Sequence, residues 1–139
     1  MYLITDRTEA DVLLGNEKGR YTYQDLNRVE QAVTLLCALA ARQNINPKLT
    51  TKINWGLPGA FSPDSWPTKS QMTRYLQNVR TLCAQLDIQA TLPKSMARLT
   101  YVGANQIEKA LQAAYEQMQG VLQTYQFSGE LIAGEENGL

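Results

Sequence analysis

The stretch from residue 100 to residue 126 constrains the fold more than any other part of this chain of 139 residues. Apolar residues recur along it at alternating steps of three and four, which places them on one narrow face of an α-helix. Such a face has to pack against other helices, because it is too apolar to face water. We therefore expect a helix over residues 101–126 at the centre of a helical domain. The apolar face consists of Ala104, Ile107, Leu111, Ala114, Met118, Val121 and Tyr125.

The opening of this stretch, TYVGANQIEKA at 100–110, repeats an earlier one, TYQDLNRVEQA at 22–32. In each copy the asparagine and the glutamate are three residues apart, so they are neighbours on one flank of a helix. They either form a binding site that is used twice or bond to the adjoining loop or partner helix. We favour the second interpretation, because polar pairs beside an apolar face fix how helices dock. The shared polar and aromatic residues are Thr22, Tyr23, Asn27 and Glu30 in one copy and Thr100, Tyr101, Asn105 and Glu108 in the other.

Three further helices are predicted from capping residues and apolar faces. Thr22 begins a helix over residues 23–43, and Thr68 begins one over residues 69–86. Asp25 stands three residues after Thr22, and Gln71 stands three residues after Thr68. Each pair has the pattern of a capping box. A short helix over residues 9–15 follows Thr8. Together with the 101–126 helix, this predicts a mainly α, single-domain fold, with the three long helices packed as an antiparallel bundle. We interpret the basic face of the 69–86 helix, which carries Lys69, Arg74 and Arg80, as a solvated surface.

The segments between and beyond the helices supply the candidate contacts. Residues 44–67 contain four of the five prolines, so they form a long loop rather than a helix. A loop of this length is either packed by its own side chains or functional, and we place it over one end of the bundle. Residues 1–7 and 127–139 are expected to be extended arms. The acids of the second arm oppose the basic face of the 69–86 helix in charge, either within one chain or between copies. The candidate partner contacts are Trp55, Phe61, Trp66, Phe127 and Glu130.

Composition excludes several function classes. Lysine plus arginine and aspartate plus glutamate both number 13, so the net charge is zero and the footprint of a nucleic-acid binder is missing. The sequence contains no histidine, which removes histidine-based catalysis and the common zinc sites. It also lacks the glycine-rich motifs that hold phosphates, and we expect no cofactor, no metal and no enzymatic activity. For Cys37 and Cys83 we favour two buried thiols over a disulfide.

The sequence also bears on location. The first residues lack a basic region followed by a long apolar run, so we expect no signal peptide. No stretch is apolar over the roughly 20 residues that a membrane span requires. We therefore expect a protein made in a cytoplasm.

Six motifs in a fixed order carry a resemblance to a known group. They are DRTEADV at 6–12, DLNRVE at 25–30, KINW at 52–55, YLQNV at 75–79, ANQIE at 104–108 and FSGEL at 127–131. In this order they resemble small proteins encoded among the tail genes of phages and prophages of Gram-positive bacteria, which are labelled minor structural or baseplate-region proteins. The chain departs from that group at Val102 and Gly103, where acidic residues are expected.

The resemblance implies a virion component in the tail tip or baseplate region. It implies contacts with other tail proteins and with further copies of the same chain, and one version is an adaptor to a fibre or receptor-binding protein. It supplies no catalytic residue. The alternative from another class is a small intracellular binding or regulatory module that acts on a phage or host protein. An enzyme without a sequence signature is the third and weakest alternative.

Overall fold

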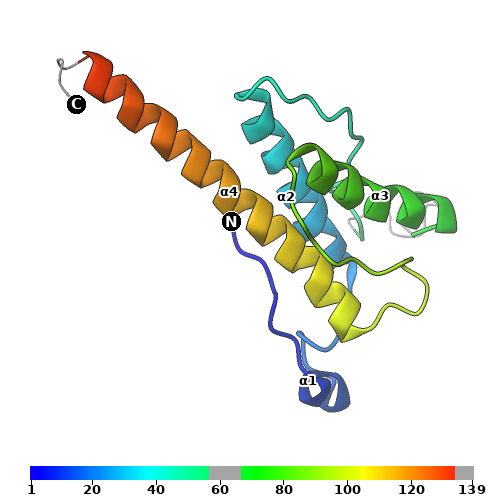
Figure 1. Ribbon diagram of the computed structural model, residues 1–139. Helices are drawn as coiled ribbons and strands as arrows, with labels where there is room; N and C mark the ends of the chain where they lie inside the picture. Colours follow the sequence, from blue (N-terminus) through cyan, green and yellow to red (C-terminus); the bar gives the residue numbers. More distant parts are fainter. Residues whose placement is uncertain (57–66, 134–139) are drawn as a thin grey trace.

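The protein is mainly α-helical. The structure is a computed structural model that describes residues 1–56 and 67–133, with side chains described as far as residue 120. This part of the chain contains four helices and no strand, which confirms the predicted fold class (Figure 1). The helices are α1 (Glu9–Leu14), α2 (Tyr23–Ala41), α3 (Lys69–Gln85) and α4 (Tyr101–Ala133).

The helices begin at the predicted capping residues. Thr8 and Thr22 each form a complete capping box with the aspartate three residues later. Thr68 accepts a hydrogen bond from the backbone N–H of Gln71 at 3.1 Å, but the buried Oε1 of Gln71 has no hydrogen-bond partner. Thr100 accepts from the third residue of α4 at 3.3 Å, and this residue is a glycine with no side chain to reach back. The two boxes of α1 and α2 are therefore complete, and those of α3 and α4 are half formed.

α4 is longer than predicted. We expected residues 127–139 to be an extended arm, and this is wrong for residues 127–133, which continue the helix to Ala133. One glycine inside a helix costs about 1 kcal/mol relative to alanine, which a long helix with good neighbouring formers tolerates. In Figure 1 the C-terminal part of α4 extends well beyond the other helices. Residues 134–139 lie outside the described part of the chain.

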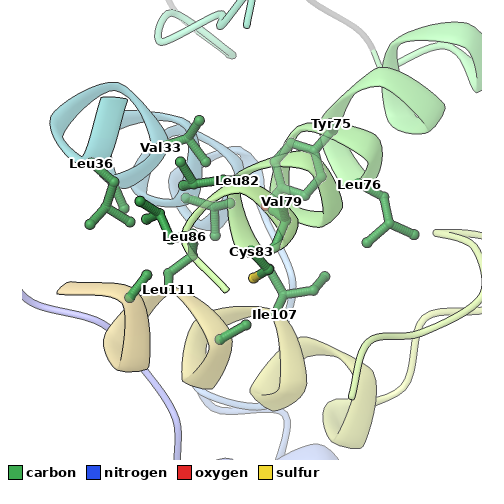
Figure 2. Close-up of a cluster of buried hydrophobic side chains, with 14 of the residues drawn as sticks. Val33, Leu36, Tyr75, Leu76, Val79, Leu82, Cys83, Leu86, Ile107 and Leu111 are labelled. Atoms are coloured by element: carbon green, nitrogen blue, oxygen red, sulfur yellow. The ribbon is translucent and has the colours of Figure 1, made fainter. Parts of the chain in front are cut away.

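α2, α3 and α4 pack against one another in pairs around one apolar core. Figure 2 shows its central side chains, which come from all three helices. Cys83 belongs to this core, Cys37 lies at its edge, and neither cysteine forms a disulfide. The prediction of two buried thiols rather than a disulfide therefore holds for Cys83, whereas Cys37 is free but only half-buried. The most deeply buried apolar residues include Val33, Leu36, Trp55, Tyr75, Val79, Leu82, Ile107 and Leu111.

The three long helices run in the same general direction, so the predicted antiparallel bundle is wrong. Near the start of α3, Arg74 binds Glu30 near the start of α2. In the same way, Arg28 of α2 binds Glu108, which lies in the third turn of α4. The early turns of all three helices are therefore linked, and Figure 1 shows α2 and α4 running on similar courses, with α3 inclined to both.

Contacts further along α3 and α4 agree with this direction. In Figure 2, Cys83 lies beside Ile107, and Leu86 lies beside Leu111, so both helices pass the core in the same order. At the next turn, the side chain of Gln117 donates to the carbonyl oxygen of Leu86 at 2.6 Å. α3 and α4 are thus side by side with the same polarity.

The shared direction explains why the connections are long. The 19 residues of α2 span about 28 Å, and the chain has to return over this length before α3 can begin beside the start of α2. The expected position of the loop over one end is also wrong for its described residues. Thr51 bonds the hydroxyl of Thr34, and Trp55 bonds Asn27, so this segment runs back along the side of α2.

The Ile107→Asp variant is expected to unfold the domain. The side chain of Ile107 is completely buried in the core, and a charge there would have no partner, which costs more than about 4 kcal/mol. The matched control is Val102→Asp in the first turn of α4, where the side chain is 47% exposed and an acid suits the helix N-terminus. Thermal melting followed by circular dichroism compares them. A normal transition for Ile107→Asp would contradict the described core.

Candidate functional site

Two asparagines on equivalent turns of α2 and α4 each hold the backbone of an extended segment. Asn27 accepts from the backbone N–H of Trp55 at 2.8 Å and donates to its carbonyl oxygen at 3.0 Å. Asn105 does the same with Arg7, at 3.0 Å and 2.9 Å. One side-chain amide thus satisfies both polar groups of a residue that has no strand or helix partner.

The glutamate three residues later is buried in both helices. Glu108 is fully buried and accepts from the backbone N–H of Ile4 at 2.9 Å. Its carboxylate also accepts from the guanidinium groups of Arg7 at 2.6 Å and Arg28 at 2.7 Å. The N-terminal segment is therefore joined to α4 at two points, Arg7 and Ile4, and runs antiparallel to the helix.

Glu30 has the equivalent role on α2. Its carboxylate accepts from the indole N–H of Trp55 at 2.7 Å and from Arg74 of α3 at 2.7 and 3.0 Å. Trp55 is completely buried, so it anchors its segment to α2 and is not exposed to a partner. Arg74 also donates to the carbonyl oxygen of Thr50 at 2.7 Å. The repeated asparagine and glutamate thus bond the adjoining segment and the neighbouring helix, as the favoured interpretation of the sequence predicts.

The arginines that complete this network were not identified from the sequence. Arg7 and Arg28 lie between Asp25 and Glu108, so two positive and two negative groups are packed together with little exposure to water. Burial alone would lower the pKa of Arg28, but its bonds to Glu108 and Asp25 raise that pKa above the ordinary value, and the guanidinium stays charged. The sequence did contain an indication of their shared role, because Arg28 and Arg74 each stand six residues after a capping threonine.

The basic face of α3, which we expected to be solvated, is not solvated at Arg74 and Arg80. Arg74 is bound to Glu30, and Arg80 donates to the carbonyl oxygens of Pro93 and Lys94 at 3.0 and 2.8 Å. Only Lys69 of the predicted face is exposed without an ion pair in the described part of the chain.

α3 carries a groove that we name the α3 groove. Its volume is about 750 Å³, and its lining includes the apolar side chains of Met72, Leu76 and Met96. Two exposed lysines, Lys69 and Lys94, also line it, and none of its described lining residues is acidic. The remaining lining residues are Pro67, Thr68, Thr73, Arg80, Ser95 and Ala97.

α1 presents an apolar surface that the domain does not cover. None of its six residues is buried. Val12, Leu13 and Leu14 are 44%, 80% and 78% exposed, respectively. α1 therefore contributes little to the core, and its leucines are free to contact another molecule.

The remaining residues that the sequence singled out lie in other places. Tyr23 packs against Gly56, where a Cβ would lie 2.4 Å from the tyrosine ring and φ is +69°. Tyr101 lines a cleft between α1 and the start of α4. The other predicted partner contacts are not described: Phe61 and Trp66 lie outside the described residues, as do the side chains of Phe127 and Glu130 in α4.

The comparisons with known proteins add no relative. A scan against models of protein families, a search of curated proteins and a search of solved structures each returned no match. Within residues 1–56 and 67–133, no helix combines the length and apolar character needed to cross a membrane. In the described part of the chain, no group of acidic and cysteine side chains is arranged to hold a metal ion.

The Asn105→Asp variant should lower the free energy of unfolding by about 1–3 kcal/mol. The aspartate cannot donate to the carbonyl oxygen of Arg7, and it adds a negative charge close to Glu108. Gln106→Glu makes the same charge change one position later, at a half-buried side chain with no hydrogen bond in the structure, and should change stability little. Urea unfolding compares the two variants. Equal stability would contradict the role of the asparagine.

Stability should also fall at alkaline pH. The hydroxyls of Tyr21 and Tyr75 are hydrogen-bonded to each other, and burial raises the pKa of both phenols above the ordinary value of 10.0. Both phenols then stay neutral in the folded state while they ionise in the unfolded state, so their contribution is present below pH 10 and is lost as the pH rises further. Urea unfolding at a series of pH values measures the loss. The double variant Tyr21→Phe/Tyr75→Phe should lose less stability above about pH 10, and an equal loss would assign the effect to other groups.

Proposed function

We propose that this chain is a non-enzymatic structural protein of a phage or prophage tail, in the tail-tip or baseplate region, that acts through protein–protein contacts. Its partners would be other tail proteins and further copies of itself, and its final location the virion. An adaptor to a fibre or receptor-binding protein is the most specific form of this proposal. The ordered sequence motifs at 6–12, 25–30, 52–55, 75–79, 104–108 and 127–131 support it.

The observation that carries the proposal is the uncovered apolar surface of α1. Leu13 and Leu14 are about four-fifths exposed, at 80% and 78%, although the chain has a well-packed core to which they could contribute. Adjacent leucines on a helix with no buried residue are expected where a partner covers them. The buried ionic network supports the same proposal, because its side chains are bonded within the domain and serve to fix its shape.

The direct test is peptide mass spectrometry of particles purified from an induced culture of the source strain. The proposal predicts this chain at a constant ratio to the major tail proteins. If the chain is abundant in the lysate but missing from the particles, the structural role is wrong and a regulatory module becomes the better explanation.

Substitutions in α1 test whether its exposed leucines make the contact with the particle. Leu13→Glu/Leu14→Glu should fold normally, because neither side chain is buried, but the variant should be depleted from particles. Val102→Asp, which changes another exposed apolar residue, is the control and should be incorporated like the natural chain. Normal incorporation of the α1 variant would show that another surface makes the contact.

A further inference from the structure

A cleft lies between α1 and the start of α4, and we name it the α1–α4 cleft. Its volume is about 370 Å³, and Figure 1 shows both segments at this end of the molecule. Three cationic side chains line it, those of Arg7, Lys18 and Arg20, and none of its described lining residues is acidic. Apolar and aromatic side chains, including those of Tyr21 and Leu99, form much of the remaining lining. The cleft therefore combines positive charge with apolar surface.

The start of α4 adds unpaired backbone donors to this cleft. The N–H groups of Gly103 and Ala104 bond Thr100, but those of Tyr101 and Val102 have no acceptor in the part of the chain that the structure describes. Tyr101 lines the cleft. The first turn of α4 also lacks the acidic residue that the first turns of α1 and α2 contain. The aligned peptide dipoles leave about half a positive charge at such a helix start, which favours an anion.

Arg7 gives an independent indication of a ligand. Its side chain is only 1% exposed, and two of its three guanidinium nitrogens are bonded within the domain. The third nitrogen, Nε, is buried and has no hydrogen-bond partner among the described residues. A buried donor without an acceptor is costly. An anion that enters the cleft beside Arg7 would supply the acceptor that this nitrogen lacks.

The charges that remain unpaired select the class of anion. Arg7 is balanced by the carboxylates of the buried network, and Lys18 is paired with Asp6 at 2.9 Å. Arg20 is the one lining cation without an ion pair in the described part of the chain. Together with the start of α4 it offers little more than one unit of positive charge. This matches a carboxylate better than a phosphate group, which carries up to about two negative charges at neutral pH.

We propose that the α1–α4 cleft is a binding site for a carboxylate that carries an apolar group. The carboxylate lies between Arg20 and the start of α4, and the apolar group lies against Tyr21 and Leu99. A free carboxylic acid and an acidic side chain beside an apolar residue of another protein share this chemistry. The proposal is independent of the tail assignment, because the site consists of this chain's own residues.

A titration of the isotope-labelled full chain, followed by NMR, tests the proposal with hexanoate as the probe. The backbone N–H signals of Tyr101 and Val102 should shift in a saturable way, because these groups become hydrogen-bonded to the carboxylate. Hexanamide has the same apolar chain without the charge, and it should bind at least about tenfold more weakly.

Arg20→Gln removes the unpaired cation and should raise the dissociation constant for hexanoate at least about fivefold. Arg20 is exposed, so the variant should fold normally. The matched control is Arg42→Gln, which makes the same change at an exposed arginine outside the cleft and should bind hexanoate like the natural chain.

Two further probes separate the sources of the carboxylate. Tighter binding of N-acetyl-leucyl-glutamate amide than of hexanoate would assign the site to a protein side chain, and the reverse order to a free acid. The absence of saturable shifts up to concentrations on the order of 50 mM would overturn the proposal. So would an Arg20→Gln variant that binds like the control, equal binding of hexanamide, or tighter binding of inorganic phosphate than of either carboxylate. None of these measurements needs a virus particle, so their failure leaves the mass-spectrometric test of the tail assignment intact.

Discussion

The structure depends on side chains that hold extended segments against helices. Asn105 and Glu108 of α4 bind the N-terminal segment, which leads through α1 to α2. Asn27 and Glu30 of α2 bind the segment that precedes α3, and Arg80 of α3 binds carbonyl groups of the segment that precedes α4. Each long helix therefore holds the segment leading to another one. The last helix, α4, holds the first segment, so the contacts link all three long helices in a ring. Each connecting segment returns to the beginning of the helices before the next helix starts, and the helices therefore share one direction.

The charges in this network contribute more to specificity than to net stability. Arg7, Arg28, Asp25 and Glu108 balance one another, but removing four charged groups from water offsets much of their attraction. Loss of any one of them would leave a buried charge unpaired, at a cost of about 3–5 kcal/mol. An apolar contact could slide by a turn, whereas these bonds form in one register only. A domain that has to present fixed surfaces to its partners benefits from this restriction.

The sequence predicts the local features of this fold well and the long-range ones poorly. Capping threonines and apolar faces lie within a few residues of one another, so the helix starts and the core residues such as Ile107 follow from them. The direction of the helices depends on where a long connection goes, which periodicity does not report. The lengths of the two connections were the available signal, because short loops join antiparallel neighbours and long ones allow a return. Asn105 and Glu108, two of the partners of Arg7, are about 100 residues away in sequence, and no local pattern reveals them.

Amide hydrogen exchange of the N-terminal segment tests the central claim most directly. The backbone N–H groups of Ile4 and Arg7 belong to no helix or strand and donate instead to side chains of α4. If α4 holds this segment, both amides should exchange as slowly as amides in the middle of the helices, because only opening of the domain frees them. Exchange at the rate of an unstructured peptide would contradict the account, since the N-terminal segment would then not be bound to α4.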